Sequence, residues 1–129
     1  MKRVFRYSVA AALLLSAFLA AVNLSRQQPE TEIIRKLSGL RLSLELYRMK
    51  EKSLPRDFSE VVKKGYLEDI PVIKLKWRPG NSSMKHRASF RPENTGSWAY
   101  VNDPKDENFG LIHIDSLEKD PRGRYWSEL

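Results

Sequence analysis

The chain has 129 residues, of which 41% are hydrophobic and 30% charged, with a formal net charge of +7 and no cysteine. This length fits a single domain, and the balance of apolar and charged residues excludes wholesale disorder. Without cysteine, a disulfide framework, a thiolate zinc site and a cysteine nucleophile are excluded.

The excess positive charge is concentrated at the N-terminus. Lys2, Arg3 and Arg6 supply three of the +7 charges, and no acidic residue occurs in the apolar run that follows. Farther along, Lys and Arg are interleaved with Asp and Glu, and the sequence holds no recognition-helix, zinc-finger or RNA-binding sheet motif. We therefore expect a solvated surface of mixed charge and no nucleic-acid partner.

Residues 1–25 are predicted to form a basic leader and an apolar membrane anchor. A helix from Tyr7 to Leu24 would be about 27 Å long, close to the ~30 Å hydrocarbon layer. A cleaved signal peptide is the second interpretation, although a cut after Ala21 would put Leu19 where a small residue is usual, and a soluble helix is the third. An anchor or a signal would place the domain formed by residues 26–129 outside the cytoplasm. The residues assigned to the anchor are Val9, Leu13, Leu14, Leu15, Phe18, Leu19 and Val22.

Residues 30–52 have the spacing of an amphipathic helix, and Pro29 either begins this helix or kinks a continuous one. The predicted buried stripe consists of Ile33, Leu37, Leu40, Leu44 and Tyr47. At ~100° per residue, three further apolar residues lie on roughly the opposite side of the helix. These residues are Leu42, Leu46 and Met49. They are either covered by the next helix of the domain or form a contact surface for another subunit.

A short second helix is predicted directly after the long one. Leu54-Pro55 ends the long helix, because proline cannot continue it. Asp57 and Glu60, three residues apart, form a capping pair for the short helix, which Gly65 closes. This helix is in a position to cover the outer side of its predecessor.

The remainder of the chain alternates as β-strands do. In residues 73–77, Ile73, Leu75 and Trp77 are predicted to face the core, while the lysines between them face water. Weaker strand signals are separated by turn-rich loops and predict an antiparallel sheet of three or four strands. They cover residues 87–90, 98–101 and 111–115.

The order of these elements, together with several short motifs, resembles type IV pilins and type II secretion pseudopilins over nearly the whole chain. The motifs are Leu44-Glu45-Leu46-Tyr47 before Leu54-Pro55, Gly65-Tyr66-Leu67 with Ile70-Pro71, Trp98-Ala99-Tyr100 with Gly110-Leu111-Ile112, and the closing Asp120 to Trp126. The resemblance implies an α+β fold in which a long N-terminal helix packs against a small antiparallel sheet. It also implies a structural subunit with one helix in the inner membrane and its C-terminal domain in the periplasm. The implied partners are other pilin-like subunits and a secretion or pilus platform, with no small-molecule substrate.

One expected motif of that family is absent. Pilins and pseudopilins usually carry a Gly-Phe-Thr-Leu-x-Glu-like prepilin peptidase motif at the start of the apolar helix, and this chain has neither that motif nor a glutamate in the apolar run. A subunit that is merely anchored, or that sits at a filament end, agrees with this absence. The alternative function is an anchored or secreted monomer that binds an anionic ligand or partner through a basic sheet face.

Metal binding and catalysis find little support in the sequence. The resemblance raises a calcium site at Asp115, Glu118 and Asp120, but we predict turn and surface roles for these residues and no metal or cofactor. His113 lies between two isoleucines of a strand and is predicted to face water with Asp115, while His86 lies in a polar loop. We therefore expect no enzyme. The aromatic residues expected to pack the sheet against the helix are Trp77, Trp98 and Tyr100.

Overall fold

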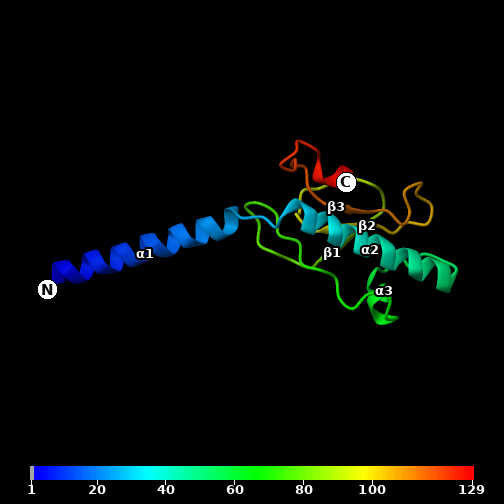
Figure 1. Cartoon of the computed structure of the whole chain (residues 1–129), viewed down its shortest axis with the longest axis horizontal. Helices are drawn as coiled ribbons and strands as arrows, with labels where there is room; N and C mark the ends of the chain where they lie inside the picture. The colour runs from blue at the N-terminus through cyan, green and yellow to red at the C-terminus, as the bar shows by residue number, and fades with distance from the viewer. Residues whose placement is uncertain (1) are drawn as a thin grey trace.

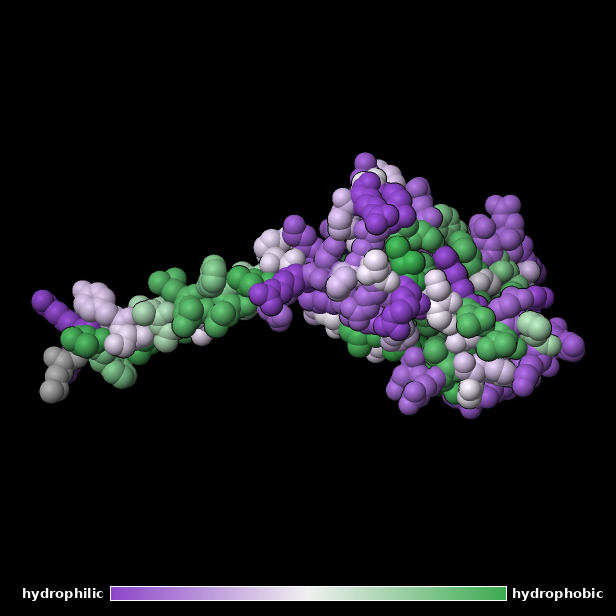
Figure 2. Space-filling model, in the orientation of Figure 1, coloured by the Kyte–Doolittle hydropathy of each residue, from purple (hydrophilic) through white to green (hydrophobic). Residues whose placement is uncertain are grey.

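The structure, a computed structural model that describes residues 2–129, separates an extended helix from a folded head. α1 (Lys2–Ser25) extends away from the head, which comprises residues 26–129 (Figure 1). Within Lys2–Ser25 no residue is buried, and the apolar side chains form a continuous hydrophobic surface in Figure 2. With 24 residues, α1 is about 36 Å long and is apolar enough to span a bilayer.

α2 (Glu30–Glu51) is a separate helix, so Pro29 begins a new helix and does not kink a continuous one. The Pro29 carbonyl accepts the first hydrogen bonds of α2, from the backbone N–H groups of Glu32 and Ile33. Gln28 fastens the junction to the head, because its backbone N–H donates to the Lys74 carbonyl at 3.0 Å and its side chain also bonds the 72–74 segment. Residues 26–29 therefore join two separate helices and are themselves fastened to the head.

α2 packs against the sheet through the predicted stripe, all of which is buried. Trp98 and Tyr100 lie in the same core, as expected, and each places its polar atom on a backbone carbonyl. This arrangement of one long helix on a small sheet confirms the α+β class. The core residues outside α2 are Phe58, Val61, Ile73, Leu75, Trp98, Tyr100, Ile112, Ile114 and Trp126.

The sheet is mixed, which differs from the predicted antiparallel meander. Its strands are β1 (Met84–Arg87), β2 (Trp98–Val101) and β3 (Ile112–Ile114), in that spatial order. β2 and β3 pair antiparallel, whereas β1 and β2 pair parallel, so the prediction is wrong for one of the two pairs. The reason is residues 88–97, which cross over the sheet face opposite α2 instead of turning back as a hairpin.

Residues 73–77 do not form the predicted strand. Among the described residues, Ile73 alone of this segment makes a β-bridge, with Asn81. Ile73 and Leu75 are buried as expected, but Trp77 is 61% exposed, so its predicted place in the core is wrong. The segment instead runs past the C-terminal end of α1, where the Trp77 N–H donates to the Leu24 carbonyl at 2.6 Å.

Two short helical segments complete the head. α3 (Ser59–Lys63) follows Asp57, whose carboxylate accepts the Ser59 N–H at 3.0 Å, and it is followed by Gly65 with φ +82°. The predicted short helix and its closing glycine are therefore confirmed, but Asp57 and Glu60 do not form the predicted capping pair, because Phe58 precedes the helix and the Glu60 carboxylate pairs with Lys63. The 3-10 turn η1 (Trp126–Glu128) closes the chain and buries Trp126 against the sheet.

Candidate assembly surface

Three apolar side chains form a line on the outer side of α2. Leu42, Leu46 and Met49 are 62%, 42% and 58% exposed, and their spacing of four and three residues places them opposite the buried stripe. α3 does not cover them, because the chain after α2 packs beside Tyr47, whose ring centroid lies 5.5 Å from that of Tyr66. The interpretation in which the domain covers these residues is therefore wrong. We call Leu42, Leu46 and Met49 the outer strip.

The outer strip is bordered by charges of both signs. Glu45 and Arg48 form an exposed ion pair along one edge, with Arg48 Nε 3.0 Å from Glu45 Oε2. The hydrogen bond that Arg48 donates to Glu45 lowers the pKa of Glu45 and raises the pKa of Arg48. Both groups are thus charged at neutral pH, and the strip can meet a similar surface without net repulsion.

The apolar character is confined to the half of α2 farther from α1. Toward α1, the same line of the helix continues through Ser38 and Arg35, which are exposed and polar. The outer strip is therefore a bounded patch on the head and is not a continuation of the apolar surface of α1.

α1 presents its apolar residues on all sides. Of the residues assigned to the anchor, Val22 is half-buried and the others are exposed. The hydroxyl groups of Ser8 and Ser16 donate to the carbonyls of Val4 and Ala12, each at 2.9 Å. These bonds satisfy both hydroxyl donors inside the helix, as a hydrocarbon environment requires.

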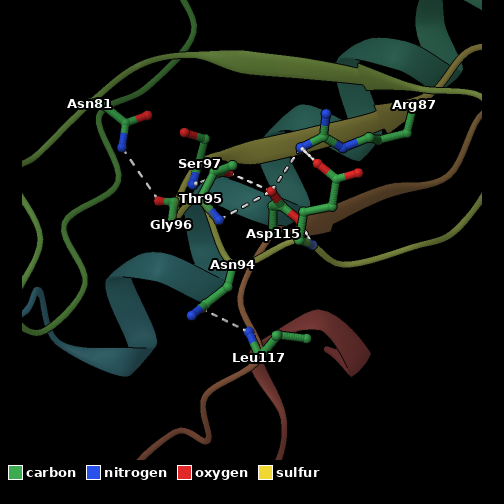
Figure 3. A network of polar contacts seen from close by, with 9 residues as sticks. Asn81, Arg87, Asn94, Thr95, Gly96, Ser97, Asp115 and Leu117 are labelled. Carbon is green, nitrogen blue, oxygen red and sulfur yellow. Dashed lines mark hydrogen bonds and ion pairs between the residues drawn. The ribbon is translucent and has the colours of Figure 1, made fainter.

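A buried polar cluster on the opposite side of the sheet is centred on Asp115 (Figure 3). Its carboxylate accepts the backbone N–H of Glu93 at 2.7 Å and both donors of Thr95, and it pairs with Arg87 at 3.2 Å. Burial raises the pKa of Asp115, but these hydrogen bonds outweigh it and hold the pKa below its ordinary value. The expectation that Asp115 faces water is wrong, because this cluster fixes residues 88–97 over the sheet.

His113 lies on the same face and is also buried, contrary to prediction. Its side chain points away from the isoleucine face of β3, as alternation requires, but the Phe90 ring covers it at a centroid distance of 4.8 Å. Neither ring nitrogen has a hydrogen-bond partner among the described residues, and burial lowers the pKa of His113 to about 4. His113, a neutral imidazole covered by the Phe90 ring, is therefore part of the core.

His86 has a structural partner that lies far from it in sequence. Its Nε2 atom accepts the Phe58 N–H at 2.9 Å, and the Asp57 carboxylate lies 3.6 Å from the same nitrogen. Sequence reasoning could not find this pair, because parallel pairing of β1 brings His86 beside the start of α3. The contact fixes α3 against the sheet.

The carboxylates considered for calcium do not converge. They are Asp115, Glu118 and Asp120. Asp115 belongs to the buried cluster, while Asp120 accepts the Arg124 N–H and its guanidinium, each at 2.8 Å. Arg124 also pairs with Glu30, which ties the C-terminal tail to the start of α2. Within residues 2–129 no group of three or more metal-binding side chains occurs.

No family model, curated protein or solved structure matches the chain. The resemblance to pilins and pseudopilins therefore stays a prediction from the sequence. The structure adds the α+β class, a helix of membrane-spanning length and a bare apolar strip on the helix that follows it.

Proposed function

We propose that the protein is a membrane-anchored structural subunit of a pilus-like or pseudopilus-like assembly. In this proposal α1 spans the inner membrane once and the head lies in the periplasm. The observation that carries the proposal is the outer strip, which is left bare on a head that follows a membrane-length helix. Apolar patches exposed next to polar surface are typical of contacts with other proteins.

The occupant we propose for the outer strip is another subunit of the same kind. Helices that span one bilayer hold their heads on the same side and at the same height, which raises the effective concentration of one head beside the next. A patch along the side of α2 is then a lateral face that a neighbouring head can reach. The Glu45–Arg48 border supplies both signs of charge, so two such faces need not repel each other.

The alternative, a monomer with a basic sheet face, has less support in the arrangement of the sheet. α2 covers one face of the sheet, and residues 88–97 cover the other. Arg87, the arginine of β1, is paired with both Glu93 and Asp115. A paired and half-buried guanidinium is poorly placed to bind an added anion, which favours the assembly proposal.

Cross-linking in membranes tests this proposal directly. The chain has no cysteine, so each introduced cysteine reports one position. With a bismaleimide, Leu42→Cys and Met49→Cys are each expected to give cross-linked dimers, because one cysteine in each chain can join only two chains. Lys105→Cys, exposed on the loop between β2 and β3, is the matched control and is expected to stay monomeric. Monomers at all three positions would favour the monomeric binding module.

A charge placed in the outer strip separates assembly from folding. Leu46→Glu, introduced into Leu42→Cys, is expected to abolish the cross-linked dimer, because a carboxylate cannot enter an apolar contact without a partner. Leu46 is exposed, so the free energy of unfolding should change by less than about 0.5 kcal/mol. Thermal unfolding followed by circular dichroism provides that check. A cross-linked dimer that survives in a folded variant would place the contact elsewhere.

A further inference from the structure

Trp77 occupies an unusual backbone conformation beside the end of α1. It lies in the turn from Leu75 to Arg78 with φ +62°, a left-handed conformation that a bulky side chain rarely adopts. The side chain gains little burial in return, since most of its surface is exposed. Strain that persists without packing gain is typical of positions kept for a function.

The position of Trp77 along the molecule is set by α1. The backbone N–H of Trp77 donates to the carbonyl of Leu24, the last apolar residue of the helix. If α1 spans a bilayer, this residue lies where the hydrocarbon layer ends and the headgroups begin. Tryptophan is enriched at that level, because its indole ring is apolar while the N–H of that ring is polar.

Positive charge gathers around the same level. Lys74 Nζ donates to the Leu24 carbonyl at 3.0 Å, which places a cation on the C-terminal carbonyls of α1. Lys76 and Lys119 line a depression of about 360 Å³ beside Ser25 and Gln27. Neither of these two lysines forms an ion pair within residues 2–129.

The one carboxylate among the residues that line this depression is already occupied. Asp120, which also lines it, is bound by Arg124, and Glu30 pairs with Arg122 and Arg124. The charge that remains free there is therefore positive. In Figure 1 the loops that carry Lys76 and Lys119 both lie on the side of the head nearest α1, and Figure 2 shows hydrophilic side chains around the end of the apolar helix.

We propose that this end of the head is a docking surface for the phosphate groups of anionic lipids. It consists of Lys76, Trp77 and Lys119, and we call these residues the base. Trp77 enters the headgroup layer, and the two ammonium groups bind lipid phosphates, each strengthening the contact by about fivefold, as basic residues near an anionic leaflet do. This inference rests on the proposed function in one respect, namely that α1 lies in the bilayer.

The test uses the whole chain in vesicles of phosphatidylcholine, with or without phosphatidylglycerol. Trp98 and Trp126 are buried, so quenching of tryptophan fluorescence by neutral acrylamide reports chiefly on Trp77, and Trp77→Phe supplies the background. The quenching constant of Trp77 is expected to be at least about twofold lower in the anionic vesicles, because an indole in the headgroup layer is shielded from water. Equal quenching in both vesicles would overturn the proposal.

Lysine variants identify the groups that bind phosphate. Lys76→Glu with Lys119→Glu is expected to remove the difference between the two vesicles. The matched control is Lys63→Glu with Lys105→Glu, two exposed lysines elsewhere on the head, which should keep it. The difference should also be independent of the protein-to-lipid ratio. Its loss on dilution of the protein would show that a second copy covers Trp77, and would overturn the lipid assignment.

Flotation of the same samples separates this inference from the anchor. If the chain floats with the vesicles but Trp77 stays open to acrylamide in both, the lipid-docking base is wrong and the anchor is correct. If the chain does not float with either vesicle, the anchor itself is wrong, and the base falls with it.

Discussion

Asp115 and His113 face the same side of β3, yet their surroundings select opposite charge states. Asp115 is surrounded by donors, which hold the pKa of its carboxyl low. His113 is covered by Phe90 and has no hydrogen-bond partner in the described chain, so the neutral imidazole is favoured. The nearby charges of Arg87 and Arg41 also lower the pKa of His113, while Asp115 raises it. Residues 88–97, which cross over this face of the sheet, thus create both environments.

The pKa of His113 predicts how stability depends on pH. The folded-state pKa of about 4 lies below the ordinary value of 6.5, so the unfolded chain binds the proton more readily. The stabilisation is therefore complete above about pH 6.5 and is lost as the pH falls toward 4. Between about pH 7 and 5, the loss should be about 2 kcal/mol.

His113→Leu tests this dependence. The variant should lose that part of the pH slope, and at neutral pH it should be no less stable, because two unsatisfied buried nitrogens are removed. Denaturant unfolding at several pH values measures both effects. Equal slopes in the original chain and His113→Leu would assign the acid sensitivity to other groups.

The Asp115 cluster predicts a large effect from a single substitution. Asp115→Ala removes the buried acceptor of three donors in residues 88–97 and one of the two carboxylates paired with Arg87. The free energy of unfolding should fall by about 3 kcal/mol, as expected when one partner of a buried pair is removed. Glu118→Ala, at an exposed carboxylate three residues away, should have an effect below about 0.5 kcal/mol. Similar losses in both variants would contradict a structural role for the cluster.

Among the elements, α2 was the most predictable from sequence and the sheet the least. The helix runs over Glu30–Glu51 with the expected buried stripe, because a 3.6-residue period over many turns is a strong local signal. The periodicity also located the outer strip, but only the packing of the segment around Tyr66 beside Tyr47 shows that the strip is bare. Local patterns cannot show which faces a distant segment covers.

The strands show where local signals end. β2 was placed at its observed residues, Trp98–Val101, whereas β1 lies at Met84–Arg87, ahead of the predicted segment. Parallel pairing and the covering of His113 both follow from the path of residues 88–97, which depends on the distant carboxylate of Asp115. The predicted core position of Trp77 is wrong for a related reason. Alternation with lysines indicates a strand, but it cannot show that the segment turns and bonds to the end of α1.

The residues that follow α2 and α3 provide a pair of predictions about left-handed backbone conformation and stability. Lys52, the residue after α2, has φ +63° and still donates its N–H to the Arg48 carbonyl. Lys52→Gly should raise the free energy of unfolding by about 0.5 kcal/mol, because relief of left-handed strain exceeds the added entropy of the unfolded chain. Gly65→Ala should lower the free energy of unfolding by about 1 kcal/mol, because φ is +82° at this position. No neighbouring atom obstructs a Cβ there, so the loss comes from the backbone conformation alone. Chemical denaturation measures both, and changes of the same sign would contradict the backbone explanation.

At the scale of the whole molecule, the direction of α1 relative to the head determines whether the base and the outer strip can act together. Three contacts set that direction. Gln28 bonds the 72–74 segment, Lys74 donates to the end of α1, and Trp77 donates to the Leu24 carbonyl. The break at residues 26–29 is therefore a braced joint, and α1 should not swing freely.

Spin labels at Leu19→Cys and Lys105→Cys test this joint in vesicles, because the chain has no other cysteine. A narrow distance distribution is expected, and Pro29→Ala should keep it, since Gln28 still holds the junction. Gln28→Ala with Lys74→Ala removes side-chain bonds from both sides of the joint and should broaden the distribution. Lys63→Ala is the control, because Lys63 lies in α3, away from the joint and the base, and pairs only with Glu60 among the ion pairs of the described chain. A broad distribution in the otherwise unchanged chain would mean that the head is tethered loosely. Neighbouring outer strips would then have no fixed alignment to favour assembly.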